Sequence, residues 1–260
     1  MSDEWKRRAR SFDACAAEYD AFRPSYPAGA IDEILRFGRL QPGARALEIG
    51  PGTGKATRLL EDRGLRVTGI EPGAELIEVA RARCPTSRFH RSTFEEWALG
   101  DDAGRFDLVV AAQSFHWVDQ TTGYAKTAEA LRPRGVLALF WNRPRITAGS
   151  LFARLEGIYS EYVAASETVT EAQLPEIELS IDRCIEGTGL FAKPARAEFP
   201  WTDRLSSNAY VSLLTTTSLC ATMEADRRDE VVARLRAMID AHGGEVDVGY
   251  TTVLHLAKRL

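Results

Sequence analysis

The feature of this sequence that most constrains its fold is a glycine-rich stretch that follows a short apolar segment and precedes a helical pattern. The stretch runs from Leu47 to Thr57 and reads LEIGPGTGKAT, with glycine at positions 50, 52 and 54. Glycine adopts positive φ at little steric cost, so such a loop turns sharply and points backbone N–H groups at a polar or anionic ligand. We therefore expect a ligand site where a strand ends and a helix begins.

Strand and helix patterns alternate around this stretch. Five apolar segments are expected to be strands, at 44–49, 66–70, 87–90, 106–112 and 136–141. Three segments between them are expected to be helices, at 56–63, 74–83 and 124–131. Such alternation predicts right-handed crossovers and a parallel sheet covered by helices on both faces.

The alternation ends after Trp141. Helical patterns are expected over 147–193, with a loop at 174–176, and over 206–219 and 226–241, whereas 195–201 and 250–256 are expected to be the last two strands. The predicted fold is α/β: a doubly wound, mostly parallel, seven-stranded sheet with a helical insertion after the fifth strand. The expected parts of the chain are an N-terminal helical lid at 1–40, a ligand-binding core at 41–146, a helical substrate cap at 147–194, and C-terminal strands and helices at 195–260 that complete the core and the cap.

The N-terminal lid is expected to begin with an amphipathic helix. Trp5, Ala9, Phe12, Ala16 and Tyr19 recur at alternating spacings of four and three, which is one stripe of a helix. The prolines of RPSYP, residues 23–27, end this pattern, because a proline cannot continue a helix.

The composition argues against several classes of function. The 260 residues carry a formal net charge of −4, unlike a protein that binds nucleic acid through its overall charge. The four cysteines are scattered, without the spacing of a zinc site or a disulfide framework, so no metal site is expected. No apolar run is long enough to span a membrane, and the N-terminus lacks a signal-peptide core. We expect a cytoplasmic protein without nucleic-acid or membrane partners.

Three ligand classes use loops similar to the glycine stretch. A nucleoside-triphosphate loop requires G-x-x-x-x-G-K followed by Ser or Thr, but Ile49 stands at the place of the first glycine and Ala56 at that of the hydroxyl. The dinucleotide fingerprint G-x-G-x-x-G needs a third glycine for close helix packing. The third-glycine position is Lys55 when the motif is counted from Gly50, and Thr57 when it is counted from Gly52. Neither pattern fits.

The third class fits without adjustment. Glu48, Gly50, Gly52 and Gly54 form E-x-G-x-G-x-G, which resembles the first motif of class I S-adenosylmethionine-dependent methyltransferases. The resemblance implies a Rossmann-like sheet and S-adenosylmethionine as the cofactor, with the loop bending beneath the amino-acid portion of the cofactor.

A second resemblance to this family follows in the next strand. Glu71 ends this strand in the segment VTGIEPG, with Pro72 beside it. A carboxylate here can accept both ribose hydroxyls of the cofactor, which is the role that the resemblance implies. The alternative is that Glu71 serves the first turn of the following helix, and the two roles are compatible.

The segment HRSTFEEW, residues 90–97, follows the third expected strand. The family commonly has an acid here that binds the adenine amino group, but this chain has Ser92 and Thr93, followed by Phe94. We expect a hydroxyl or a backbone group to bond the adenine edge and Phe94 to pack on the ring. Alternatively, the segment is a simple loop with Phe94 in the core.

The segment FDLVVAAQSFHWVD, residues 106–119, narrows the resemblance. Its AQSFHW is similar to a subgroup of small-molecule methyltransferases that includes trans-aconitate-type carboxyl methyltransferases and bacterial tailoring enzymes. YDAFRPSYP, residues 19–27, resembles the entry segment of the same subgroup. After the fourth strand the sequence has neither an NPPY-type motif, usual in enzymes that methylate adenine or glutamine, nor a Pro-Cys pair for attack on cytosine. The resemblance therefore implies a small-molecule substrate.

Four residues are candidates for cofactor contacts beyond the two motifs. Gln113 is expected to bond the amino-acid end of the cofactor, while Tyr19, Arg23 and Tyr26 close over it from the N-terminal segment. The guanidinium of Arg23 suits the cofactor carboxylate because it binds carboxylates in a bidentate manner. The alternative for Arg23 is a surface salt bridge.

The acceptor side is expected to involve Phe115, His116, Trp117 and Arg143. His116 is the candidate catalytic base or substrate clamp, or else FHW packs beneath the insertion and closes the pocket. Arg143 is expected either to bind an anionic substrate or to lie in solvent. The other histidines, His90, His242 and His255, are expected to be structural.

The sequence thus predicts an enzyme that transfers the methyl group of S-adenosylmethionine to a small-molecule acceptor, by O-methylation of a carboxyl or hydroxyl group. Such a displacement depends mainly on proximity and orientation, and it requires a base only if the acceptor must lose a proton. The alternatives are N- or C-methylation, a cofactor-binding partner protein without turnover, and an NAD(P)-dependent oxidoreductase. Both a monomer and a homodimer fit the sequence.

Overall fold

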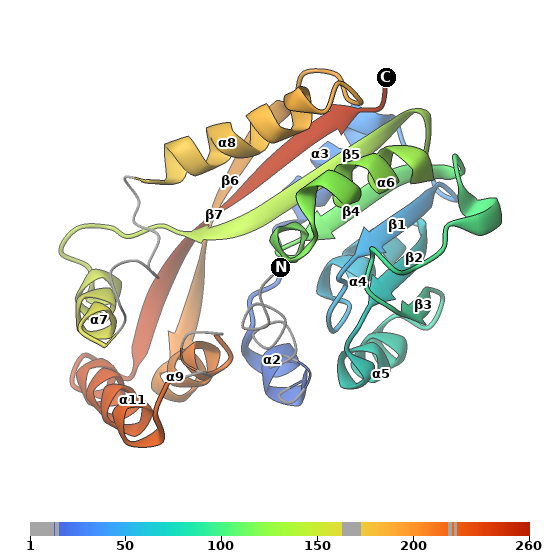
Figure 1. Ribbon diagram of the computed structural model, residues 1–260. Coiled ribbons are helices and arrows are strands. Elements are labelled where there is room, and N and C mark those ends of the chain that lie inside the picture. Colours follow the sequence, from blue (N-terminus) through green and yellow to red (C-terminus); the bar gives the residue numbers. More distant parts are fainter. Residues whose placement is uncertain (1–12, 14–15, 163–172, 218–219, 221–222) are drawn as a thin grey trace.

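The computed structural model describes residues 13, 16–162, 173–217, 220 and 223–260, and a seven-stranded sheet lies at its centre. The strands are β1 (Arg45–Ile49), β2 (Arg66–Glu71), β3 (Arg88–Arg91), β4 (Phe106–Ala112), β5 (Leu131–Pro144), β6 (Ala195–Ser206) and β7 (Glu245–Lys258). Their order is β3-β2-β1-β4-β5-β7-β6 (Figure 1). All neighbours are parallel except that β7 is antiparallel to both β5 and β6. The predicted fold class is confirmed.

Helices cover both faces of this sheet. They are α2 (Ala16–Phe22), α3 (Ala28–Gly38), α4 (Lys55–Glu61), α5 (Ala74–Arg83), α6 (Gln120–Ala130), α7 (Leu151–Ser160), α8 (Leu174–Gly187), α9 (Ser207–Thr215) and α11 (Ala225–Asp240), with short turns at η2 (Gly100–Asp102) and η3 (Phe115–Trp117). Side chains alternate between the faces along each strand. In β1, Leu47 therefore joins the core beneath α6 and α8, while Ala46 joins the core beneath α3 and α4.

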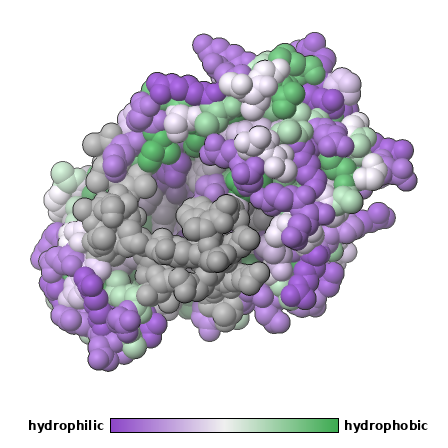
Figure 2. All heavy atoms as spheres, in the orientation of Figure 1, coloured by the Kyte–Doolittle hydropathy of each residue, from purple (hydrophilic) through white to green (hydrophobic). Residues whose placement is uncertain are grey.

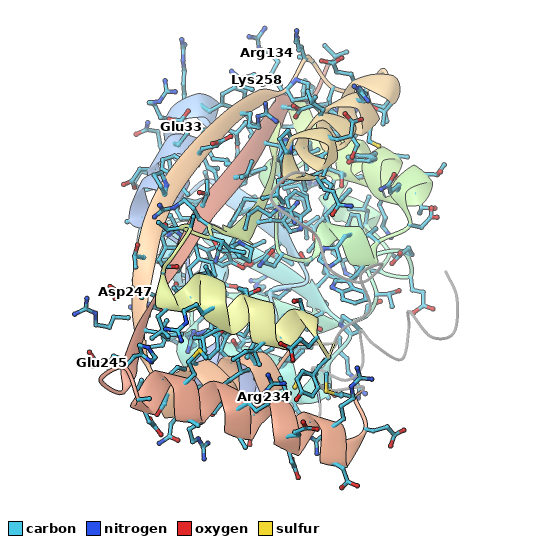
Figure 3. The ribbon with its side chains drawn as sticks, turned by 90° about the vertical axis from the view of Figure 1, so that its left-hand side faces the viewer. Glu33, Arg134, Arg234, Glu245, Asp247 and Lys258 are labelled. Atoms are coloured by element: carbon cyan, nitrogen blue, oxygen red, sulfur yellow. The ribbon has the colours of Figure 1, made fainter. Side chains whose placement is uncertain are left out.

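The last two strands carry a second group of helices. Strand β7 runs from Glu245 to Lys258, and these two residues mark its ends in Figure 3. The part of the antiparallel β6–β7 pair that includes Glu245 extends past the parallel strands, and α7, α9 and α11 gather around it (Figure 1). Tyr210, Leu235 and Val248 belong to the separate apolar core that joins these elements.

The two helices that follow β5 pack in different places. Helix α7 belongs to the group around the β6–β7 pair, whereas α8 lies along β7 on the main sheet (Figure 1). Ile185 of α8 is completely buried in the core of the main sheet, and Ile181 packs against the same core. This placement brings α8 close to the carboxyl ends of β5 and the neighbouring strands.

Helix α2 connects the parallel part of the sheet to the second group of helices, and it lies between α5 and α9 in Figure 1. Asp20 pairs with Arg83 of α5 at 2.5 Å, and its carbonyl accepts a hydrogen bond from the Lys55 ammonium at 2.7 Å. Of the expected amphipathic stripe, Trp5, Ala9 and Phe12 lie outside the described residues.

Three local expectations differ from the structure. The loop expected at 174–176 is wrong, because α8 begins at Leu174 with Pro175 in its first turn, where the missing N–H has no cost. The helix expected at 124–131 begins earlier, at Gln120, because the Asp119 side chain accepts the Thr122 N–H and caps it. Strands β5, β6 and β7 exceed their expected ranges of 136–141, 195–201 and 250–256, because polar residues that pair with a neighbouring strand extend each of them.

Across the described residues, no helix is both long and apolar enough to cross a bilayer. The same residues contain no group of three His, Cys, Asp or Glu side chains that is arranged to hold a metal ion.

Candidate active site

The glycine loop joins β1 to α4 at the carboxyl edge of the sheet. Gly50, Gly52 and Gly54 have φ values of 64°, 56° and 82°, a region that residues with a Cβ rarely adopt. A Cβ on Gly50 would lie 2.7 Å from the Cβ of Ser114, so this part of the loop packs closely on the end of β4. A Cβ on Gly52 would meet the ring of Tyr19 at 3.9 Å. The Gly52 side of the loop is therefore the open side.

Glu71 lies at the end of β2 and ties this loop to the next helix. Its carboxylate accepts the N–H of Gly52 and the N–H of Gly73, both at 3.0 Å. Burial raises the pKa of Glu71 to about 6, although the two N–H groups oppose the shift. Each carboxylate oxygen can still accept a second hydrogen bond, so the side chain can support the loop and bind a ligand hydroxyl together.

Glu48 lies beneath the loop rather than on its open side. The residue is 1% exposed, and its carboxylate accepts the Thr57 hydroxyl of α4 at 2.6 Å. Burial raises the pKa of Glu48 to about 7, against the effect of the Thr57 hydrogen bond. The side chain thus links β1 to α4 and supports the loop from within the core.

The residues after β3 lie beside Glu71. The Ser92 N–H donates to the Glu71 carbonyl at 3.1 Å, and the Thr93 hydroxyl accepts the Glu96 N–H at 3.2 Å. Phe94 is 3% exposed in the main core, with the Lys126 ammonium 5.4 Å from its ring centroid. This position agrees with the alternative in which Phe94 is a core residue. Pro72 is exposed.

The N-terminal segment brings Tyr19 to the glycine loop but places its neighbours elsewhere. A terminal nitrogen of Arg23 donates to the Thr216 carbonyl at 2.8 Å, at the end of α9. Its guanidinium also lies 5.2 Å from the Tyr19 ring centroid. Tyr26 packs edge-on against Phe140 with ring centroids 4.8 Å apart, and burial raises its pKa well above the ordinary value.

Strand β4 ends in a sharp turn next to the loop. Gln113 has a φ of 58°, which is unusual for a residue with a Cβ and marks local backbone strain. Its N–H donates to the Phe140 carbonyl at 2.9 Å, and the Ser114 hydroxyl donates to the Ile49 carbonyl. This turn carries η3, which contains Phe115, His116 and Trp117, to the carboxyl ends of the strands.

His116 accepts a hydrogen bond at a defined nitrogen. The indole Nε1 of Trp141 donates to His116 Nδ1 at 3.2 Å. An indole N–H can only donate, so Nδ1 is the acceptor and Nε2 carries the proton of the neutral ring. Desolvation of the ring by the surrounding protein lowers the pKa of His116, and the positive charge of Arg143 lowers it further. Although His116 is exposed, both influences favour a neutral ring at pH 7.

The two aromatic neighbours of His116 differ in burial. Phe115 is 3% exposed and packs against Tyr124, with ring centroids 4.9 Å apart. Trp117 is half-buried, and its ring centroid lies 4.9 Å from that of His116. Trp117 is therefore the better placed of the two to contact an acceptor.

Arg143 does not lie free in solvent. Its Nε donates to Glu178 Oε1 of α8 at 2.8 Å, and its guanidinium lies 5.4 Å from the Trp141 ring centroid. Glu178 also bonds His255, which was expected to be an isolated structural residue. Sequence reasoning missed this contact, although Glu178 lies on the same helical stripe as Ile181 and Ile185. A carboxylate on an apolar stripe is the signal that could have revealed it.

The candidate residues face the middle of the molecule. In Figure 1 the carboxyl ends of β1 and β4 point towards α2 and the second helix group, and Figure 2 shows a hollow on this face with both hydrophilic and hydrophobic residues at its coloured border. Two shallow depressions lie outside the site. One is between the start of α7 and the start of β7, and the other is beside α6.

This fold and site define a class of α/β protein. A glycine-rich loop after β1, an acid at the end of β2 and an opening at the carboxyl edge, next to the reversal of strand order, are the features of a fold that binds a nucleoside-containing ligand.

Comparisons with known proteins identify the family. The profile of the family described as "Methyltransferase domain" matches residues 47–139. An uncharacterized methyltransferase of Mycobacterium tuberculosis is 33% identical over 234 residues, which cover 89% of this chain and 86% of the relative. Trans-aconitate 2-methyltransferase of Variovorax paradoxus is 34% identical over 110 residues, covering 41% of this chain and 42% of that protein. The chain belongs to the class I S-adenosylmethionine-dependent methyltransferases.

A solved structure supports the same fold. It comes from Anaeromyxobacter dehalogenans, where the protein is provisionally assigned as a type II methyltransferase. The two chains align with a TM-score of 0.64 and 22% identity, over 92% of this chain and 97% of the other. Membership of the family decides among the three ligand classes considered for the glycine loop: the cofactor is S-adenosylmethionine.

The described residues fit this cofactor. The loop is open at Gly52, where the backbone has positive φ and a Cβ would meet no atom of the described residues closer than 3.9 Å. The Glu71 carboxylate lies at the adjacent strand end and retains lone pairs for hydroxyl donors. A polar cradle of backbone and carboxylate groups suits the ribose and the amino-acid portion of a nucleoside-linked methionine.

Proposed function

We propose that the protein transfers the methyl group of S-adenosylmethionine to an oxygen of a small molecule, and that this oxygen belongs to a carboxylate. The observation that carries the proposal is the hydrogen bond from Trp141 Nε1 to His116 Nδ1. This bond leaves the proton of the neutral imidazole on Nε2, so the ring offers a donor there and not a base. A hydroxyl acceptor would need a base, whereas a carboxylate is already ionised at pH 7.

Bound S-adenosylmethionine supplies a methyl group on a positively charged sulfur, which an oxygen can attack without further activation. The residues proposed to hold the cofactor are Gly50, Gly52, Gly54 and Glu71, with Ser92, Thr93, Gln113 and Tyr19 around them. Glu48 is proposed to act from beneath, through the loop. Arg23, Tyr26, Pro72 and Phe94 are proposed to contribute through packing or charge, because their present contacts lie to the side of the loop.

The acceptor is proposed to bind between η3 and the end of β5. His116 would donate from Nε2 to one carboxylate oxygen, the charge of Arg143 would attract the anion, and Trp117 would pack against the rest of the molecule. Because no proton has to move, the protein's tasks are to orient the acceptor and to exclude water. The relative named for trans-aconitate, a carboxylic acid, supports this acceptor class.

The test is methyl transfer from radiolabelled S-adenosylmethionine to a panel of small mono-, di- and tricarboxylates that includes trans-aconitate. Each acid is paired with its amide and with the corresponding alcohol. The proposal predicts labelling of at least one acid and none of its matched amide. Labelling of the alcohols or amides instead would contradict the carboxylate assignment, while the enzyme class would stand.

A further inference from the structure

A buried chain of charged side chains joins α8 to the sheet behind Arg143. Glu178 is 4% exposed. Its Oε1 accepts the Arg143 Nε–H at 2.8 Å, and its Oε2 lies 2.6 Å from His255 Nε2. His255 is completely buried on β7, and its Nδ1 lies 2.7 Å from Asp182 Oδ1, one helical turn after Glu178.

Glu178 lies at the centre of this chain. Burial alone would raise the pKa of Glu178, but hydrogen bonds and charge from His255 and Arg143 outweigh it, so the pKa is lowered. Glu178 is therefore an ionised acceptor. A carboxylate oxygen lies within hydrogen-bond distance of each ring nitrogen of His255, so Glu178 and Asp182 hold the ring between them.

Such a cluster is a poor device for stability alone. Buried ion pairs are costly to desolvate, and apolar residues of similar size often serve a core as well or better. On the same face of α8, Ile181 and Ile185 already pack the helix onto the sheet through apolar contacts. The charged chain therefore calls for a reason other than packing.

Arg143 is held on two sides. Glu178 binds its Nε edge, and Trp141 lies under its guanidinium at 5.4 Å. Within the described residues, no hydrogen bond to its two terminal nitrogens is found. A guanidinium held by its Nε edge can still present its terminal edge to a second carboxylate in a bidentate manner. Fixing the side chain beforehand reduces the entropy lost when that carboxylate binds.

We propose that Glu178 is a positioning residue that holds Arg143 ready for a carboxylate of the acceptor, and that His255 and Asp182 fix Glu178. The acceptor class then includes small molecules with a second anionic group, apart from the oxygen that receives the methyl group. This inference rests on the proposed function, but its central contact can be measured without turnover.

The test uses NMR of the full chain saturated with S-adenosylhomocysteine, with acetate as the carboxylate probe. The Arg143 Nε–H signal, assigned by its loss in Arg143→Lys, should exchange slowly with water and shift as acetate is added. In Glu178→Gln this signal should broaden, and the acetate affinity should fall by about fivefold or more, the scale of one hydrogen bond. Far-UV circular dichroism confirms that the variant is folded.

Glu176→Gln is the matched control, because it removes the same charge from the same helix. Glu176 pairs only with Arg183 among the described residues, and both are exposed, so the Arg143 signal and the acetate affinity should not change. Equal effects in the two variants, or a Glu178→Gln protein with unchanged signal and affinity, would overturn the proposal.

Arg143→Lys provides the second measurement if Glu178→Gln does not fold. Lysine keeps the charge but lacks the planar fork, so the acetate affinity should again fall by about fivefold or more. Unchanged acetate binding in Arg143→Lys would overturn the role of Arg143 as the anchor. These outcomes differ from failure of the proposed function, which would appear in the acceptor panel as methylation of uncharged molecules.

Discussion

Trp141 donates its indole N–H to Nδ1 of His116 over 3.2 Å, joining the end of β5 to the turn that follows β4. This contact decides which nitrogen of His116 carries a proton. Since the proton lies on Nε2, the ring offers a hydrogen-bond donor to an acceptor molecule. The contact therefore separates two roles that the sequence left open, a base and a substrate clamp.

The His116→Gln variant distinguishes these two roles. The side-chain amide of glutamine can donate near the place of Nε2 but cannot act as a base at neutral pH. If His116 is a clamp, the variant should retain about a tenth or more of the wild-type rate, because at most about one hydrogen bond is lost. A base would be revealed by a fall of about 10²- to 10⁴-fold. Steady-state rates with any acceptor found in the panel give the answer.

Glu71 should matter for cofactor binding more than an ordinary acid of the first helical turn. Replacing Glu71 with alanine should weaken S-adenosylhomocysteine binding by about 1.5–3 kcal/mol, the scale of hydrogen bonds to a charged group. The control is Glu75→Ala, which removes an exposed acid from the first turn of α5. Titration calorimetry of both variants checks this. Equal losses would reduce Glu71 to a helix-terminal charge, and unchanged affinity in Glu71→Ala would remove it from the site.

The glycines of the loop should differ in how they tolerate a side chain. Gly50→Ala adds positive-φ strain of about 1–2 kcal/mol and a contact with Ser114 that costs about 1–3 kcal/mol more. Gly52→Ala adds the strain without that contact, since the nearest atom to its Cβ in the described part of the chain is in Tyr19, 3.9 Å away. Urea unfolding should therefore rank Gly50→Ala as the less stable variant. The opposite order would mean that the loop packs differently on β4.

Glu48 should make the protein less stable as the pH rises. Its pKa is raised from the usual 4.5 to about 7, so the native state holds the proton more tightly than the unfolded state. This contribution is fully present below about pH 4.5 and is lost as the pH rises through about 7, by up to about 3 kcal/mol. Glu48→Gln cannot lose a proton and should show a smaller loss of stability between pH 5 and 8. Urea unfolding at several pH values tests this, and parallel curves for the two proteins would contradict it.

Much of the fold and of the cofactor side was predictable because it depends on local patterns. The alternation of apolar segments gave the parallel strands, and the positions of the loop glycines gave the turn, since their spacing reflects backbone conformation. The acceptor side was not predictable to the same degree. The bonds from Trp141 to His116 and from Arg143 to Glu178 join residues that are far apart in the chain. Such contacts leave no periodicity in a single sequence.

The two helices after β5 illustrate the same limit. Both have apolar stripes, yet α7 packs against α9, α11 and the start of β7, whereas α8 packs on the main sheet. A stripe predicts that a helix face is buried but does not say against which partner. Pro175 at the start of α8 shows a second limit of sequence patterns. A proline breaks a helix when it lies in the interior but is favoured in the first turn, so the residue alone does not tell whether a helix ends or begins there.

The most direct test of the central claim is the chemistry of the labelled product. Methyl esters hydrolyse in mild alkali and release labelled methanol, whereas methyl ethers and methylamines do not. After transfer from tritiated S-adenosylmethionine to an acceptor from the panel, we predict that the label becomes volatile on alkaline treatment. Label that stays in the product would contradict carboxylate methylation and, with it, the role given to the Nε2 proton of His116.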